Sequence, residues 1–202
     1  TRDFKPEEIG RLEQVMETRD AIRRAMASAG IQREDDVHFV QIKCPLLTAS
    51  RISEAALRGH TTACHDTYES MGYSRGASAL GVAVALGDLT AEQLSNDKIC
   101  SDWSLYSTRA STSAGIELLR NEVLVLGNAA GWDPAYRSGH AVMEDALDTA
   151  AIDRALASMP GSAQLTITPD NLTGLLVKAE PSASGEIRGN RHVMSDDSDI
   201  NG

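Results

Sequence analysis

Apolar side chains at helical spacing predict a long helix near the start of the chain. Between residues 9 and 26 the apolar residues keep the spacing of one helix face, at Ile9, Leu12, Val15, Met16, Ile22, Ala25 and Met26. This is the pattern of a helix that buries one face. Pro6 and the two glutamates after it suit the first turn, and Gly30 suits a C-terminal end. We therefore expect a helix from Pro6 to Gly30.

The next pattern, from Asp36 to Leu47, is typical of a buried strand. It contains a run of apolar, largely β-branched residues that Pro45 interrupts, and Lys43 stands at the end of that run. A lysine in this place has three plain outcomes. It can extend its amine to water, it can pair with a carboxylate, or burial can suppress its charge so that it acts as a base.

Further elements are expected between residues 48 and 126. Thr48 and Thr90 each suit the cap of a short helix, Met71–Gly87 is rich in Ala and Gly and predicts a closely packed helix, and Glu122–Leu126 predicts a strand. Arg75 is expected at or near the N-terminus of the 71–87 helix, where the dipole does not favour a cation. It either binds an anion or carbonyl there or forms a surface ion pair.

The segment Asp102–Leu119 contains many small hydroxyl residues and is expected to be a loop. Within it, Ser113-Ala114-Gly115 allows backbone N–H groups to approach a ligand closely, with a serine hydroxyl at the same point. Such loops are usually only connections, so the pattern alone leaves a binding role open.

The second part of the chain repeats the pattern of the first. Val142-Met143-Glu144 resembles Val15-Met16-Glu17, and residues 151–158 resemble residues 21–28. An expected strand, Asn171–Val177, ends on Lys178, which follows Lys43 by 135 positions (178 − 43). Two helix-then-strand cycles that end on a lysine predict an internal repeat.

Charge and cysteine content narrow the class of function. The formal net charge is −10 with no block of Lys or Arg, which disfavours nucleic acid and anionic membranes as partners. We see no signal peptide or membrane span. Cys44, Cys64 and Cys100 fit neither a disulfide framework nor a zinc site, so a reduced, cytoplasmic setting is expected. Cys44 is either a nucleophile beside Lys43 or, as we prefer, a small buried apolar residue.

Four long motifs resemble the cyanuric acid hydrolase and barbiturase family of ring-opening amidohydrolases. They read HFVQIKCPLLT, DTYESMGYSRGASALG, SAGIELL and KAEPSASGEIRGNRHVMSDDSDIN, and the similarity runs essentially from Thr1 to Gly202. The resemblance implies an α+β fold of three similar repeats around a pseudo-threefold axis, with sheets inside and helices outside. Residues 1–139 would be the middle repeat and residues 140–202 part of the third, so we expect the chain to be a piece of a longer protein.

The resemblance also implies roles for individual residues. Lys43 would be the catalytic base and Ser113 the nucleophile, while Arg75 and the backbone at Ser113 and Ala114 would bind a ring carbonyl. Lys178 would be the lysine of the third repeat. No metal is expected in this part and no cofactor is implied. The expected partner is a small cyclic imide, and the resemblance implies a homo-oligomer, a tetramer.

Three functions remain open from the sequence. The first is hydrolysis of a cyclic amide C–N bond of cyanuric acid by a serine that a lysine activates. The second is the same chemistry on barbituric acid. The third is a threefold small-molecule binding module without catalysis, which would need no deprotonated lysine. If the protein is an enzyme, we expect residues 1–202 alone to have little or no activity, because part of the site would be missing.

Overall fold

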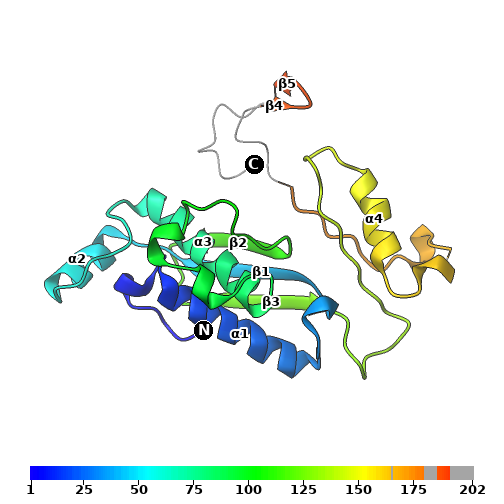
Figure 1. Cartoon of the computed structure of the whole chain (residues 1–202), viewed down its shortest axis with the longest axis horizontal. Helices are drawn as coiled ribbons and strands as arrows, with labels where there is room; N and C mark the ends of the chain where they lie inside the picture. The colour runs from blue at the N-terminus through cyan, green and yellow to red at the C-terminus, as the bar shows by residue number, and fades with distance from the viewer. Residues whose placement is uncertain (165, 180–185, 192–202) are drawn as a thin grey trace. The chain divides into compact units, whose positions relative to one another are not determined.

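The computed structural model describes residues 1–164, 166–179 and 186–191 of the 202-residue chain (Figure 1). The chain forms two compact units, Thr1–Tyr136 and Arg137–Gly202, which are described separately here. Whether these units correspond to the middle repeat and part of the third stays a prediction. None of the helices in the described residues is long and apolar enough to cross a membrane.

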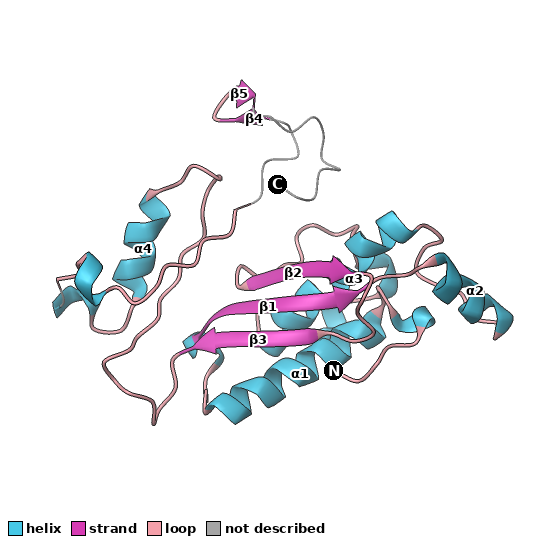
Figure 2. Ribbon diagram, turned by 180° about the vertical axis from the view of Figure 1, so that it is seen from behind, coloured by secondary structure: helices cyan, strands magenta, loops and turns pink. Residues whose placement is uncertain are grey.

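A three-stranded sheet forms the centre of the first unit (Figure 2). Its middle strand is β1 (Val37–Pro45), and this confirms the strand expected from the apolar run and its end at proline. β2 (Ala110–Gly115) pairs with β1 in parallel, and β3 (Glu122–Gly127) pairs with it antiparallel on the other side. β3 was expected, whereas β2 was not: the segment around Ser113 is a strand and not a loop. Pairing with β1 outweighs the weak strand preference of its small residues.

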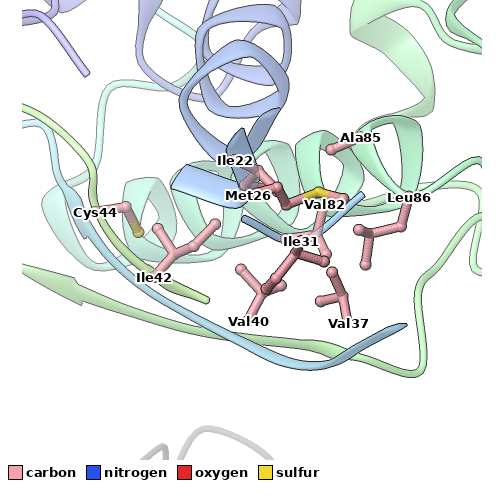
Figure 3. Close-up of a cluster of buried hydrophobic side chains, with 10 residues drawn as sticks. All are labelled: Ile22, Met26, Ile31, Val37, Val40, Ile42, Cys44, Val82, Ala85 and Leu86. Atoms are coloured by element: carbon pink, nitrogen blue, oxygen red, sulfur yellow. The ribbon is translucent and has the colours of Figure 1, made fainter. Parts of the chain in front are cut away.

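Two long helices cover one face of this sheet, as Figure 2 shows with the sheet in front of them. They are α1 (Leu12–Ala29) and α3 (Thr67–Ala85). In the core, side chains from β1 point towards those of the two helices (Figure 3), and the cluster comprises Ile22, Met26, Ile31, Val37, Val40, Ile42, Cys44, Val82, Ala85 and Leu86. The opposite face of the sheet carries Lys43 and Leu124, which are exposed in the structure. We call it the open face.

Some helices begin at other residues than predicted, because turns and capping residues set their ends. The first helix does not run from Pro6: a short 3₁₀ turn, Pro6–Glu8, comes first, and Gly10 at φ 77° breaks the path before α1 begins. Gly30 does end α1, in the left-handed conformation at φ 75°. α2 (Ala49–Leu57) follows Thr48, whose hydroxyl caps it as expected. α3 begins earlier than predicted because the Asp66 carboxylate accepts from the Glu69 N–H.

The short elements of the first unit are single 3₁₀ turns, Glu34–Asp36, Ala91–Gln93 and Asn96–Lys98. The turn at Ala91–Gln93 stands where a short helix after Thr90 was expected. It is closed by the Gln93 side chain, which accepts from the Thr90 N–H at 2.7 Å.

The second unit contains one α-helix and little other regular structure among its described residues. The elements are α4 (Ala150–Ser158), the 3₁₀ turns Ser162–Gln164 and Pro169–Asn171, and the two-residue strands β4 (Glu186–Ile187) and β5 (Asn190–Arg191). β4 and β5 form an antiparallel pair.

The predicted strand Asn171–Val177 is wrong, because these residues form no strand in the structure. A strand needs neighbours that satisfy its backbone N–H and C=O groups. In the first unit both neighbours of β1 follow it in sequence. Among the described residues no strand pairs with the 171–177 segment, so it lacks the ladder that β2 and β3 give to β1.

Candidate active site

Lys43 and Ser113 occupy opposed positions on adjacent parallel strands. The register pairs Lys43 with Ser113 and continues through Pro45 and Gly115, at the carboxyl ends of β1 and β2. Side chains at paired positions of a parallel ladder project to the same face of the sheet. The residues on either side of Lys43, Ile42 and Cys44, both point into the core. Lys43 and Ser113 therefore share the open face.

A second serine of β2, Ser111, is the alternative nucleophile, and it is placed differently. It is buried, and its hydroxyl donates to Gln41 Oε1 at 2.7 Å, the residue with which the ladder pairs it. Ser111 thus lies on the same face of the sheet as Ser113, two residues further from the carboxyl end of β2. The register favours Ser113 over Ser111 as the serine next to the lysine.

Arg75 does not lie at a helix N-terminus, because α3 begins at Thr67 and Arg75 stands in the interior of its first half. Its Nε is buried and has no hydrogen-bond partner among the described residues. The guanidinium is close enough to Cys44 and Cys100 to favour both thiolates electrostatically. This places Arg75 on the helix side of the sheet, near the end of β1 that carries Lys43. The described hydrogen bonds do not join Arg75 to Lys43 or Ser113.

Ala114 is paired with Cys44 in the ladder, and its side chain packs against the apolar core. The Cys44 thiol donates to the Ser113 carbonyl oxygen at 3.4 Å. Burial raises the pKa of the Cys44 thiol, partly offset by the Ser74 and Ser78 hydroxyls and by Arg75. A buried, protonated thiol is a poor nucleophile, so the structure supports the interpretation of Cys44 as a small buried residue.

Lys178 lies in the second unit, in a segment without regular structure, and is exposed. The structure therefore does not place it at a strand end equivalent to that of Lys43. Among the described residues, no group of His, Cys, Asp or Glu has the arrangement of a metal site.

Two features beneath the strand ends were not predicted from the sequence. One is a fully buried polar network in which Gln14 Nε2 donates to Ser74 Oγ at 2.9 Å and to Asn121 Oδ1 at 3.2 Å. The other is Arg51, whose guanidinium donates to two backbone carbonyls, those of Leu46 and Leu118. Gln14 and Asn121 are 107 positions apart, and Arg51 has the appearance of an ordinary helix-surface arginine. Neither the network nor the role of Arg51 can be predicted from patterns of neighbouring residues.

Comparison with known proteins gives consistent matches over the whole chain. It is 76% identical over 202 residues to a protein from Ectopseudomonas oleovorans named cyanuric acid amidohydrolase, and 56% identical over 204 residues to one of the same name from Enterobacter cloacae. The chain is fully covered in both matches but spans only 55% of each relative. It thus has about half the length of the curated relatives that it matches.

Solved structures agree with the sequence matches. The crystal structure of cyanuric acid hydrolase from A. caulinodans superposes with a TM-score of 0.81 at 49% identity, over 99% of this chain and 55% of that one. A second structure, titled as a cyanuric acid hydrolase that arose by structural concatenation, gives a TM-score of 0.74 at 43% identity, over 96% and 53%. The fold of these neighbours is a concatenated threefold repeat, which confirms the expected α+β repeat architecture. The strand predicted at 171–177 is not confirmed. Residues 1–202 match the family described as amidohydrolase ring-opening protein, and the chain belongs to that family.

Proposed function

We propose that the chain is part of a cyanuric acid amidohydrolase, an enzyme that hydrolyses a C–N bond of a small cyclic amide. The observation that carries the proposal is the opposition of Lys43 and Ser113 on adjacent parallel strands. The names of the relatives and of the superposed structures support cyanuric acid rather than barbituric acid as the substrate. A homo-oligomeric, tetrameric state stays a prediction from the resemblance.

The proposed reaction begins with a proton transfer from Ser113 Oγ to the neutral amine of Lys43. A serine hydroxyl becomes a good nucleophile only when an adjacent base takes its proton. Ser113 Oγ then attacks a ring carbonyl, and N–H donors and cations stabilise the new oxyanion. The candidates are the Ala114 N–H and Arg75, which lies on the helix side of the sheet and would have to act past the end of β1 that carries Lys43. The C–N bond breaks, the ring nitrogen takes the proton back from Lys43, and water hydrolyses the acyl-serine.

The protonation state of the lysine sets a requirement on the rest of the protein. A lysine amine accepts a proton only when it is neutral, a form that burial and neighbouring cations favour. Lys43 is exposed in this chain. The proposal therefore requires that other parts of the full-length protein cover the open face and supply further cations.

Substitution of the pair in the full-length enzyme tests the proposal. Lys43→Ala and Ser113→Ala should each lower kcat for cyanuric acid by about 10²–10⁴-fold, the usual contribution of a general base, with the nucleophile at least as sensitive. Lys43→Arg should fail nearly as badly, because a guanidinium stays protonated. Lys178→Arg keeps the charge and should retain more activity than Lys43→Arg.

Ser111→Ala is the matched control, and circular dichroism checks that each variant is folded. Ser111→Ala should retain more activity than Ser113→Ala. The opposite order would move the nucleophile to Ser111, and a fully active Lys43→Arg would remove Lys43 as the base. Assays on barbituric acid in parallel decide the substrate, and a folded protein that binds either ring without turnover would leave only the binding module.

A further inference from the structure

Arg51 connects the two chain segments that leave the strands of the candidate site. It lies in the first turn of α2, which follows the carboxyl end of β1 (Figure 2). Its Nη1 donates to the Leu46 carbonyl at 2.5 Å, and its Nη2 donates to the Leu118 carbonyl at 2.7 Å. Leu46 is three residues beyond Lys43, and Leu118 is five residues beyond Ser113. The planar guanidinium of Arg51 thus bridges residues 46–48 and residues 116–119, which we call the exits of β1 and β2.

The ladder itself stops before these exits. The last pair of the β1–β2 register is Pro45 with Gly115. Beyond it, among the described residues, Arg51 provides the hydrogen bonds that join residues 46–48 to residues 116–119. The first exit is also held from its other side, because Leu47 is fully buried and its N–H donates to Ser70 Oγ at 2.9 Å. The second exit is held as well, because the Phe4 N–H donates to the Leu119 carbonyl at 2.8 Å. Arg51 therefore joins two exits that are each anchored to another part of the unit.

The environment of Arg51 differs from that of an ordinary surface arginine. Its side chain is half-buried, desolvation lowers its pKa, and it forms no ion pair within the described part of the chain. Arg58, at the other end of α2, instead forms ion pairs with Glu7 at 2.7 Å and Glu54 at 2.9 Å. A cation that loses hydration without gaining a carboxylate is costly, whereas its rigid fork of donors can fix two acceptors in one geometry. Glu54 offsets part of this desolvation without forming an ion pair, and the two carbonyls are the acceptors that the described hydrogen bonds give to the Arg51 guanidinium.

We propose that Arg51 is a positioning residue for the ring-opening reaction, which sets the separation of Lys43 and Ser113 by clamping the exits of β1 and β2. The inference rests on the proposed function of that pair. Arg51 does not touch the substrate and takes no proton. Its effect is on the alignment of base and nucleophile, for which a displacement of about 1 Å can cost on the order of 100-fold in rate.

Kinetics of the full-length enzyme test the catalytic part of this inference. Arg51→Gln removes the positive charge and the guanidinium with its two sets of N–H donors. Arg51→Lys is a milder second variant, which keeps the charge but cannot donate to both carbonyls. Each should lower kcat for cyanuric acid by about 10- to 100-fold with KM within about twofold of the wild type. Arg58→Gln and Arg58→Lys, matched controls in the same helix, should leave kcat within about twofold. A raised KM with kcat retained would show that Arg51 acts on substrate binding, and would overturn the inference.

Hydrogen–deuterium exchange tests the clamp without reference to activity. Peptides that cover residues 40–48 and 111–119 should exchange faster in Arg51→Gln than in Arg58→Gln, with peptides from α1 unchanged. Unchanged exchange in both peptides, or faster exchange with unchanged kcat, overturns the inference and leaves the proposed function intact. Full activity of both Lys43→Ala and Ser113→Ala overturns the proposed function and this inference with it.

Discussion

At the scale of single residues, the Glu7–Arg58 pair gives a clear pH dependence. Arg58 Nη1 and Nη2 donate to the two carboxylate oxygens of Glu7, each at 2.7 Å. These hydrogen bonds lower the pKa of Glu7 from its ordinary value of 4.5 to about 2. The pKa of this carboxyl is therefore lower in the folded protein than in the unfolded chain, and unfolding takes up a proton between these two values.

The stabilisation from this pair is present above about pH 4.5 and is lost as the pH falls towards 2. We expect Glu7→Gln to lower the thermal midpoint of unfolding at pH 6 and to have a diminishing effect at pH 3 and below. The effect at pH 6 should be modest, because the Arg58 side chain is partly exposed and solvent screens the pair. Glu13→Gln is the control, an exposed glutamate of α1 that forms no ion pair within the described residues. A Glu7→Gln deficit that stays constant from pH 6 to 2 would contradict the assignment.

Single residues also mark the limit of what the sequence predicts about the site. Lys43 was found because it stands at the end of an apolar run, and Ser113 because it stands in a Ser-Ala-Gly segment. Their opposition depends on the β1–β2 register, which joins positions 70 apart (113 − 43). The strand around Ser113 is made of small residues with weak strand preference, so its sequence does not announce the pairing. The depth of Arg75 in α3 was missed because Asp66 was not recognised as the cap.

At the scale of elements, the contact between α1 and α3 depends on one glycine. A Cβ built on Gly81 would lie 2.5 Å from Thr18 Cβ and 2.8 Å from the Val15 carbonyl oxygen. Both distances are shorter than real Cβ contacts, and the carbonyl belongs to the backbone of α1. The two helices can approach this closely only because Gly81 has no side chain. The prediction of a closely packed Ala- and Gly-rich helix is confirmed in this respect.

Gly81→Ala should therefore destabilise the protein by about 1–3 kcal/mol, the usual cost of overpacking. Gly72→Ala is the matched control in the same helix, because its Cβ would meet nothing within 4 Å. The control should be neutral or more stable by up to about 1 kcal/mol, since alanine is the better helix former. Urea unfolding of both variants measures the difference. Equal stabilities would mean that α1 and α3 can move apart at no cost.

The elements also show why the internal repeat could be predicted only in part from the sequence. The first helix follows from the helical spacing of its apolar residues, and β1 and β3 follow from short apolar runs. The segment 171–177 has a similar apolar run, yet it forms no strand, because a strand is completed by partners and not by its own sequence. The sequence similarity of residues 171–177 to β1 thus supports an internal repeat, whereas the conformation of these residues depends on partner strands.

At the scale of the whole molecule, the chain contains one wall of the proposed site. Lys43 is exposed on the open face of the sheet, and Leu124 on the same face is 53% exposed. The relatives that match the chain are nearly twice as long. The proposed function requires a small ring to be held from several sides, and the strand ends of β1 and β2 supply one of them.

Residues 1–202 by themselves should therefore turn over cyanuric acid at least 100-fold more slowly than the full-length enzyme. A ring held from one side is not fixed to within about 1 Å of the attacking serine, and such a displacement alone costs on the order of 100-fold. The exposed lysine would also lack the cations and burial that favour its neutral form. The measurement is the rate of cyanuric acid loss for both purified proteins, with circular dichroism to show that residues 1–202 are folded. Ser113→Ala in the short chain identifies any background activity. A rate for residues 1–202 within tenfold of the full-length rate, abolished by Ser113→Ala, would mean that the wall formed by β1 and β2 is sufficient for catalysis.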